Sequence, residues 1–369
     1  MPNTYGVTIN GRFLSQRVTG VQRYAREIIL ELDNLLQGSP LPRGLHGKLA
    51  IPAGAKPDLP LRALSIAETR LGGGPLWTHF VLPAVTQGVL LSLGNIGPLL
   101  AARQIICIHD LNTFLVPESY SRVFRLYYRA ALIPVARYAA RVVTVSDFSA
   151  RMLDDFGLRP RGEITVIPNG HEHVRRWRAE CSRYAAIDQN QRPFIFVLGS
   201  RAVHKNVEML FSIARDFDAM GLDLWVAGAP GTYFSAVDSP PVPANVRMLG
   251  CVSDDDLAAL YGQALCFAFP SLTEGFGLPA LEAMALGCPV VASSAASLPE
   301  VCGDAALLAD PKSPGEWLRQ IGRLHGDSDL VCDLKAKGVR QARRFSWKAS
   351  AQAYLDLIGP LLLGASEPH

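Results

Sequence analysis

The 369 residues exceed what one hydrophobic core usually organises, so we expect two domains. The composition, 49% hydrophobic and 19% charged, is that of an ordinary globular protein. The seven cysteines are scattered and form no C-x-x-C pair, which argues against a disulfide framework or a zinc site and favours reduced thiols in a cytoplasm.

The net charge of +3 is unevenly distributed along the chain. Residues 1–190 hold 22 lysines and arginines against 14 aspartates and glutamates, whereas residues 191–369 hold 14 against 19. A basic first half suggests an anionic partner, such as a phosphate, a lipid headgroup or a nucleic acid. An ordinary solvated surface explains the same numbers equally well.

Two segments could have indicated membrane targeting. The first residues, "MPNTYGVTINGRFL", lack the basic start and long apolar core of a signal peptide. Residues 79–102 carry no formal charge, but their prolines and glycines favour a buried strand with loops over a membrane span.

In chain order, the first half alternates short β-branched runs with segments of helical spacing. These patterns predict strands at 5–10, 104–110, 141–146 and 164–168, and helices at 21–36, 121–140 and 147–157. Strands that alternate with helices indicate βαβ units and a parallel sheet.

The second half repeats this alternation after a polar join, "AIDQNQRP". Strands are predicted at 191–199, 222–229, 246–250, 266–270, 289–293 and 305–310, a first helix at 205–221, and a last amphipathic helix in 345–364. We therefore expect an α/β protein with domains at 1–188 and 189–345, whose final segment 346–369 packs back on the first domain. Ligands of such sheets bind beyond the carboxyl ends of the strands.

The stretch "EGFGLPALE" follows the predicted strand at 266–270. Gly275 and Gly277 would let the backbone approach a ligand, and the N–H groups from the loop into the helix would point at it. Glu274 and Glu282 could each accept hydrogen bonds from adjacent hydroxyls, which fits a sugar at the loop and a ribose at the helix. The alternative is a helix-start turn with two solvated glutamates.

The same stretch satisfies a dinucleotide-binding pattern. Gly275, Gly277 and Ala280 match G-x-G-x-x-G/A, and Glu300 lies twenty residues beyond Ala280. Four residues separate the first glycine from the predicted strand, and the loop comes late in its domain, so this interpretation is weaker.

Three further segments could bind a phosphate or a sugar. In "GSRAVHKN", Arg201 and Lys205 lie on the turn into a helix and could clamp a diphosphate, although surface cations are common. Gly20 opens a helix and could bring N–H groups to a phosphate, or it could be a simple turn. His109 ends a strand and would point into the expected cleft, or it could be structural.

Two patterns that resemble metal sites have simpler explanations. The acidic run after Ser253 fits a helix cap, with Asp256 three residues on. "HEH" at 171–173 lacks a third ligand and is expected to be a loop.

Taken together, the chain resembles the retaining glycosyltransferases of family 4 over nearly its whole length. The motifs that carry this resemblance occur in the family's order: "TGVQRYAREI", "IHDL", "VSDFSARML", "VIPNG", "GSRAVHKN", "EGFGLPALEAMALGCPVVAS" and "LPEVCGDAALL". The glutamate pair with seven residues between is the most specific of them. The resemblance implies the GT-B fold, in which two Rossmann-like domains face each other across a cleft, and it is nearest to bacterial mannosyltransferases of surface polysaccharide synthesis.

The resemblance also implies roles for individual residues. Glu274 would bind the donor sugar beside the backbone of Gly275, Phe276, Gly277 and Leu278, and Glu282 would bind the donor ribose. Arg201 and Lys205 would hold the diphosphate, His109 would lie near the anomeric carbon, and Gly20 would approach the phosphates or the acceptor. The nucleotide base would lie near Leu249 and Val252.

The expected activity is therefore hexosyl transfer without a metal and with retention of configuration. The donor would be GDP-mannose or, second, UDP-glucose, used as a substrate with no cofactor. The acceptor would be a glycan or a lipid-diphosphate-linked saccharide, and no nucleic-acid partner is expected. We expect a cytoplasmic protein. Arg122, Arg125 and Arg129 could contact anionic lipid at the inner face of the plasma membrane, or they could belong to a solvated face that packs its aromatic side chains. The alternatives are a GT-B epimerase or phosphorylase, a dinucleotide-binding oxidoreductase and a non-catalytic nucleotide-binding protein.

Overall fold

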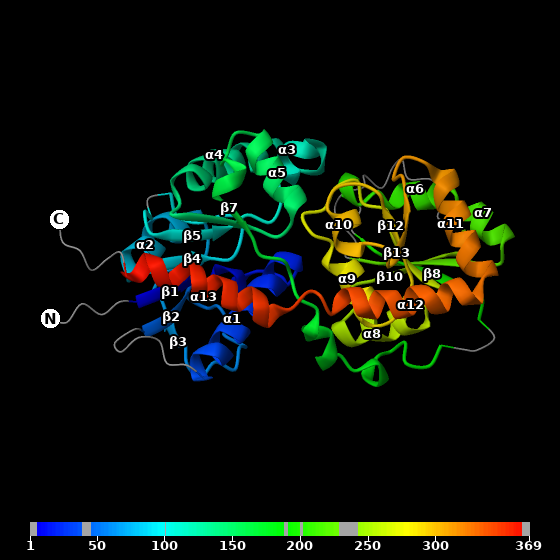
Figure 1. Ribbon diagram of the computed structural model, residues 1–369, viewed down its shortest axis with the longest axis horizontal. Coiled ribbons are helices and arrows are strands. Elements are labelled where there is room, and N and C mark those ends of the chain that lie inside the picture. Colours follow the sequence, from blue (N-terminus) through cyan, green and yellow to red (C-terminus); the bar gives the residue numbers. More distant parts are fainter. Residues whose placement is uncertain are drawn as a thin grey trace. The chain divides into compact units, whose positions relative to one another are not determined.

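The computed structural model describes residues 6–38, 46–99, 101–187, 191–199, 202–228 and 243–363. The chain divides into two compact units (Figure 1). Unit 1 takes its residues from Met1–Thr113, Ser121–Gly170 and Ser346–His369, and unit 2 from Phe114–Tyr120 and His171–Phe345.

Unit 1 is built on a parallel sheet that has seven strands in the described residues, in the order β3-β2-β1-β4-β5-β6-β7. The strands are β1 (Gly6–Asn10), β2 (His46–Ile51), β3 (Ser65–Glu68), β4 (Val89–Ser92), β5 (Gln104–Cys107), β6 (Arg141–Thr144) and β7 (Ile164–Val166). The helices are α1 (Gly20–Gly38), α2 (Leu82–Val85), α4 (Arg122–Tyr138), α5 (Asp147–Asp155) and α13 (Trp347–Leu363), with α3 (Asn112–Leu115) where the chain passes to unit 2.

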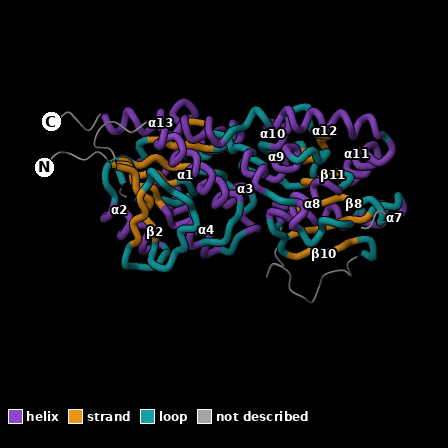
Figure 2. The backbone as a smooth tube through the Cα atoms, turned by 90° about the horizontal axis from the view of Figure 1, so that it is seen from below, coloured by secondary structure: helices purple, strands orange, loops and turns teal. Residues whose placement is uncertain are grey.

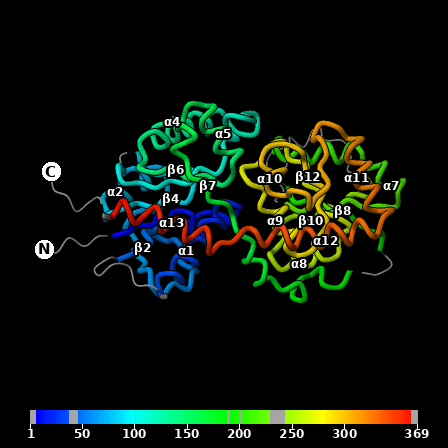
Figure 3. The backbone as a smooth tube through the Cα atoms, in the orientation of Figure 1, coloured from blue at the N-terminus to red at the C-terminus, as the bar shows by residue number. Residues whose placement is uncertain are grey.

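The C-terminal helix α13 belongs to unit 1, where it packs on α1. The hydroxyl oxygens of Tyr24 and Tyr354 are 2.8 Å apart, and both side chains are fully buried. Trp347, at the start of α13, meets the ring of Tyr24 edge-on at 5.6 Å. The red helix consequently lies among the blue and cyan elements in Figure 3, although more than 300 residues separate the two tyrosines.

Unit 2 is built on a second parallel sheet, of six strands in the described residues, in the order β10-β9-β8-β11-β12-β13. Its strands are β8 (Phe194–Leu198), β9 (Asp223–Ala227), β10 (Val246–Gly250), β11 (Cys266–Phe269), β12 (Val290–Ser293) and β13 (Ala306–Ala309). Its helices are α6 (Val207–Ser212), α7 (Ala214–Ala219), α8 (Asp254–Gln263), α9 (Leu278–Ala285), α10 (Leu298–Cys302), α11 (Pro314–Gly326) and α12 (Ser328–Ala342).

Strand β8 shows why helices cover both faces of this sheet (Figure 2). Because side chains alternate along a strand, Ile195 and Val197 point to one face, where they join a core with α6, α7, α11 and α12. Phe196 points to the other face and meets Tyr261 of α8 edge-on at 5.3 Å. A strand buried on both faces is a continuous apolar run, as "FIFVL" is.

Two boundaries differ from those expected from the sequence. Residues 171–187 belong to unit 2, whereas the expected first domain extended to 188, because Ser182 in this segment donates to Asp256 on α8 at 2.7 Å. The helix expected at 205–221 is two short helices, α6 and α7, interrupted at Ile213, whose ψ of 13° is not helical.

Candidate active site

The expected donor residues of unit 2 lie where the order of its strands reverses. The first strand of the unit, β8, lies between β9 and β11, so the connections after β8 and after β11 leave the sheet in opposite directions. This topological switch point is where open α/β sheets bind their ligands. Lys205 follows β8, and the loop that contains Glu274 follows β11.

An ion pair joins these two loops at the switch point. Lys205 Nζ donates to Glu274 Oε1 at 2.7 Å, and the two side chains are 24% and 12% exposed. The backbone carbonyl of Glu274 accepts a hydrogen bond from Ser297 Oγ at 2.9 Å, which ties the loop to the residue before α10. A charged pair at this degree of burial is held in one geometry but remains within reach of solvent.

Asn206 sets the position of the Lys205 turn. Its Nδ2 donates to the carbonyls of Pro270, at 3.0 Å, and Pro311, at 2.7 Å, and so ties this turn to the end of β11. Its φ of 54° is in the left-handed region, which asparagine tolerates better than most residues. Sequence reasoning missed this asparagine, although it stands in the "HKN" of the motif.

The glycine-rich loop has its own structural requirement at Gly277. This residue has a φ of +100°, and a Cβ there would lie 2.5 Å from Leu298 Cδ2, so the fold itself needs glycine. The side chains of Phe276 and Leu278 are buried, and Phe276 packs edge-on against Phe345. These two residues can therefore offer a ligand their backbone groups only.

The loop does not have the geometry of a dinucleotide-binding turn. Gly275 is separated from the end of β11 at Phe269, whereas the first glycine of that fingerprint follows its strand directly. Glu300, which would be the ribose-binding acid, lies in helix α10.

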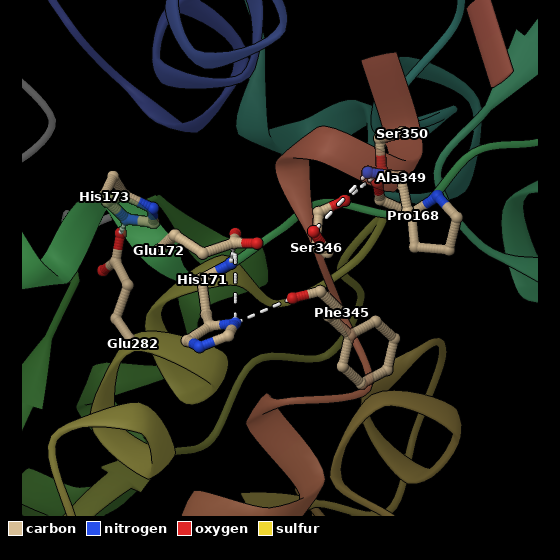
Figure 4. Close-up of polar contacts among 9 residues, drawn as sticks. All are labelled: Pro168, His171, Glu172, His173, Glu282, Phe345, Ser346, Ala349 and Ser350. Atoms are coloured by element: carbon tan, nitrogen blue, oxygen red, sulfur yellow. Dashed lines mark hydrogen bonds and ion pairs between the residues drawn. The ribbon is translucent and has the colours of Figure 1, made fainter. Parts of the chain in front are cut away.

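The second glutamate, Glu282, has a partner that the sequence analysis did not foresee. His173 Nε2 donates to Glu282 Oε1 at 2.9 Å, and the side chains are 0% and 6% exposed (Figure 4). His173 is in the "HEH" stretch that we expected to be a loop; in the structure a short 3-10 helix covers Glu172–Arg176. Its partner is 109 positions away, so no local pattern could have indicated the contact.

In unit 1, His109 is buried. Its Nε2 donates to the carbonyl of Leu93 at 2.9 Å, its backbone N–H donates to Asn95 Oδ1 at 2.6 Å, and its ring meets Tyr24 edge-on. Burial lowers its pKa to about 4, so the imidazole is neutral near pH 7. The side chain is 6% exposed and its Nε2 is already engaged by the Leu93 carbonyl, which is the arrangement of a structural histidine.

A hollow of about 290 Å³ lies beside His109, at the switch point of unit 1. Its lining includes Asn10, the last residue of β1, Arg12 just beyond it, and Leu93 to Ile96, which follow β4. Leu93 and Asn95 thus both line the hollow and hold His109. Amide and guanidinium groups at this position could bind hydroxyls or an anion.

The remaining expected site residues are placed as follows. Gly20 is the exposed first residue of α1, and a Cβ there would meet nothing within 4 Å. Leu249, in the edge strand β10, and Val252, just beyond it, are half-buried. Arg201 lies outside the described residues.

The acidic run after Ser253 is a helix cap, as predicted. Ser253 Oγ accepts from the N–H of Asp256, and the Asp256 carboxylate accepts from the N–H of Ser253. Among the described residues, no group of three His, Cys, Asp or Glu side chains could hold a metal ion. Within the same ranges, no helix has the length and apolar character needed to cross a membrane.

Comparisons with known proteins agree with this architecture. Two family models match: "Glycosyl transferases group 1" over residues 192–327 and "Glycosyltransferase Family 4" over residues 78–175. The O-antigen chain mannosyltransferase B of Escherichia coli is 31% identical over 256 residues, which cover 67% of this chain and 67% of that protein. The MMP alpha-(1->4)-mannosyltransferase of Mycolicibacterium hassiacum is 34% identical over 59% of this chain and 53% of its own length.

A solved structure shows the same fold. The sucrose-phosphate synthase of Thermosynechococcus elongatus has a TM-score of 0.71, covering 98% of this chain and 100% of that one. The sequence identity is 18%, so this likeness concerns the fold alone.

Proposed function

Because this chain belongs to glycosyltransferase family 4 and has the GT-B fold, we propose that it transfers a hexose from a nucleoside-diphosphate sugar to a saccharide or lipid-linked saccharide acceptor. Mannose is the first candidate, because the matched relatives in Escherichia coli and Mycolicibacterium hassiacum are named as mannosyltransferases. The observation that carries the proposal is the Lys205–Glu274 pair at the switch point of unit 2. Helix α9, which follows the Glu274 loop, carries Glu282 about one turn from its start.

The chemistry follows from the charges of these side chains. As a sugar leaves a nucleoside diphosphate, negative charge grows on the β-phosphate and positive charge on the anomeric carbon. Lys205, with Arg201, would hold the phosphates and stabilise the leaving group, and the N–H groups of Gly275 to Leu278 would add dipoles. Glu274 would accept hydrogen bonds from sugar hydroxyls, and Glu282 would accept them from the ribose.

Cationic side chains can neutralise the leaving diphosphate themselves, so we propose that transfer needs no metal ion. We further propose retention of configuration by return of the acceptor oxygen to the face that the phosphate leaves, with no covalent sugar–enzyme intermediate. Nuclear magnetic resonance of the first product formed would report the anomer. A trapped glycosyl–enzyme adduct would contradict the front-face route.

We assign the acceptor to the hollow of unit 1. Its polar lining from Asn10, Arg12 and Asn95 suits saccharide hydroxyls, and its 290 Å³ would hold about one sugar ring. His109 would act there as a neutral group rather than as a cation, because its pKa is about 4. Leu249 and Val252 are assigned to the base of the donor, GDP or UDP.

An exposed apolar surface of unit 1 supports a contact with anionic lipid. Tyr127 on α4 lies 3.5 Å from His79 of η2 (Trp77–Val81), so these two elements are neighbours. Together with Leu76, which directly precedes η2, they expose four large apolar side chains: Val123 (81%), Leu126 (75%), Leu76 (74%) and Phe80 (71%). Arg122 and Arg125 flank this surface, whereas Arg129 is turned inward and donates to the carbonyl of Thr113. Apolar side chains bordered by cations suit an anionic bilayer and would place the protein at the inner face of the membrane.

The membrane contact can be tested by co-sedimentation with vesicles. The protein should bind phosphatidylglycerol-containing vesicles more strongly than phosphatidylcholine vesicles, and the double variant Val123→Ser, Leu126→Ser should bind neither. Tyr138→Ser, which removes an exposed ring at the other end of α4, is the matched control. Equal binding to both vesicle types would contradict the proposal.

The donor can be tested by thermal shift with GDP, UDP, ADP and NAD. A nucleotide at a hundred times its dissociation constant stabilises by about 2.7 kcal/mol, which is a measurable shift. A shift with GDP or UDP supports the transferase and identifies the base. A shift with NAD alone would favour the dinucleotide-binding alternative.

A further inference from the structure

The buried contact between His173 and Glu282 connects a segment that the proposed reaction does not use to one of its proposed binding residues. Nε2 lies 2.9 Å from Oε1, and the histidine side chain is 0% exposed. The imidazole is also packed edge-on against Trp177, at 5.4 Å between ring centroids. Histidine and carboxylate are therefore held in one mutual orientation (Figure 4).

Stability alone does not account for this pair. A buried ionisable pair is costly to desolvate, and replacing both partners with apolar side chains of similar volume is often neutral or stabilising. A site that binds hydroxyls, however, needs a carboxylate whose oxygens are held in a fixed orientation toward those hydroxyls. A carboxylate offers about four acceptor positions, and His173 occupies one of them.

We infer that His173 is a positioning residue for the donor ribose. By donating to Oε1, it fixes the plane of the Glu282 carboxylate before the donor binds. Binding of the ribose hydroxyls then costs no side-chain entropy at Glu282. The chain's preference for a ribonucleotide over a deoxyribonucleotide then depends on His173. This inference rests on the proposed role of Glu282 in donor binding.

The neighbouring histidine provides a matched control. His171 lies two positions before His173, but its Nδ1 donates to the backbone carbonyl of Phe345, at 2.7 Å. Its ring also lies 4.0 Å from the Glu172 carboxylate, whereas the partner of His173 is Glu282. Figure 4 shows the two imidazoles of this segment with these different partners.

The experiment measures the affinity for GDP and for 2′,3′-dideoxy-GDP by isothermal titration calorimetry, with the uridine pair in parallel. The unaltered protein should prefer the ribonucleotide. In His173→Leu, the affinity for the ribonucleotide should fall about tenfold, as expected for loss of one hydrogen bond to a charged group, and the dideoxy affinity should change little. His173→Gln, which places an amide N–H near the position of Nε2, should keep the preference, and His171→Asn should also keep it.

The outcomes separate this inference from the proposed function. If Glu282→Gln abolishes the preference but His173→Leu keeps it, Glu282 binds the ribose and the role of His173 is overturned. If the unaltered protein has no preference, or binds neither nucleotide pair, the proposed role of Glu282 fails and the inference fails with it. Should His173→Leu not fold, His173→Asn serves instead, because its amide is too short to reach Glu282; a retained preference in that variant overturns the inference.

Discussion

Lys205 and Glu274 neutralise each other across the switch point of unit 2, with Nζ 2.7 Å from Oε1. The cation that we assign to the diphosphate and the carboxylate that we assign to the sugar thus form one ion pair. Removing either leaves an uncompensated charge that is only 12–24% exposed. Because the two groups have different proposed ligands, we expect Glu274→Ala and Lys205→Ala to lose different functions.

Glu274→Ala should abolish transfer while leaving nucleotide binding intact. The released Lys205 remains able to meet the phosphates, but the sugar loses its hydroxyl acceptor, so kcat/KM should fall about 100-fold or more. Lys205→Ala should instead weaken the binding of GDP or UDP. Transfer assays combined with thermal shift separate the two effects, and full transfer by Glu274→Ala would refute its assignment.

Gly20→Ala tests the proposed approach of a ligand to the start of α1. A Cβ at this position meets no atom within 4 Å, so the change should leave the melting temperature unaltered or slightly raised. If a phosphate or the acceptor approaches this backbone, activity should fall about tenfold or more. Gly262→Ala, at an exposed helical glycine with the same open surroundings, is the control and should keep full activity. Unchanged activity in Gly20→Ala would indicate a simple turn.

The strands and most helices could be predicted from the sequence, because buried parallel strands are continuous apolar runs bounded by turn residues. The short strands β2 and β3 were missed: β3, "SIAE", lies at the edge of the sheet and is largely exposed. The position of His109 at a strand end was also predicted, but not its burial. The direction of a side chain beyond a strand depends on the neighbouring loop, here Leu93 to Asn95.

The residues that position the candidate binding residues were harder to predict than the binding residues themselves. Glu274 and Glu282 belong to one local motif, "EGFGLPALE", and Lys205 belongs to another, "GSRAVHKN". Ser297 and His173 act on these residues from 23 and 109 positions away, and each is ordinary in its own sequence context. A single sequence carries no signal for such long-range partners.

Asn206→Ala should destabilise unit 2 substantially. The variant loses two side-chain hydrogen bonds, to Pro270 and Pro311, and places alanine at a φ of 54°. These effects together should cost about 2–4 kcal/mol. Asn206→Gly loses the same hydrogen bonds without the backbone strain, so its melting temperature should lie between those of Asn206→Ala and the unaltered protein. Equal melting temperatures for both variants would show that strain contributes nothing.

The stability of unit 1 should fall when the pH is lowered from 7 to 5, and His109 should account for part of the fall. Burial lowers its pKa in the folded protein to about 4, from the ordinary histidine value of 6.5, so the unfolded chain binds a proton in this range and the folded chain does not. The resulting loss is about 2 kcal/mol between pH 7 and pH 5, and it levels off below pH 4. His109→Gln can still donate to Leu93 but does not titrate, so calorimetry should give a smaller drop in melting temperature for this variant. An identical drop would mean that His109 does not titrate in this way.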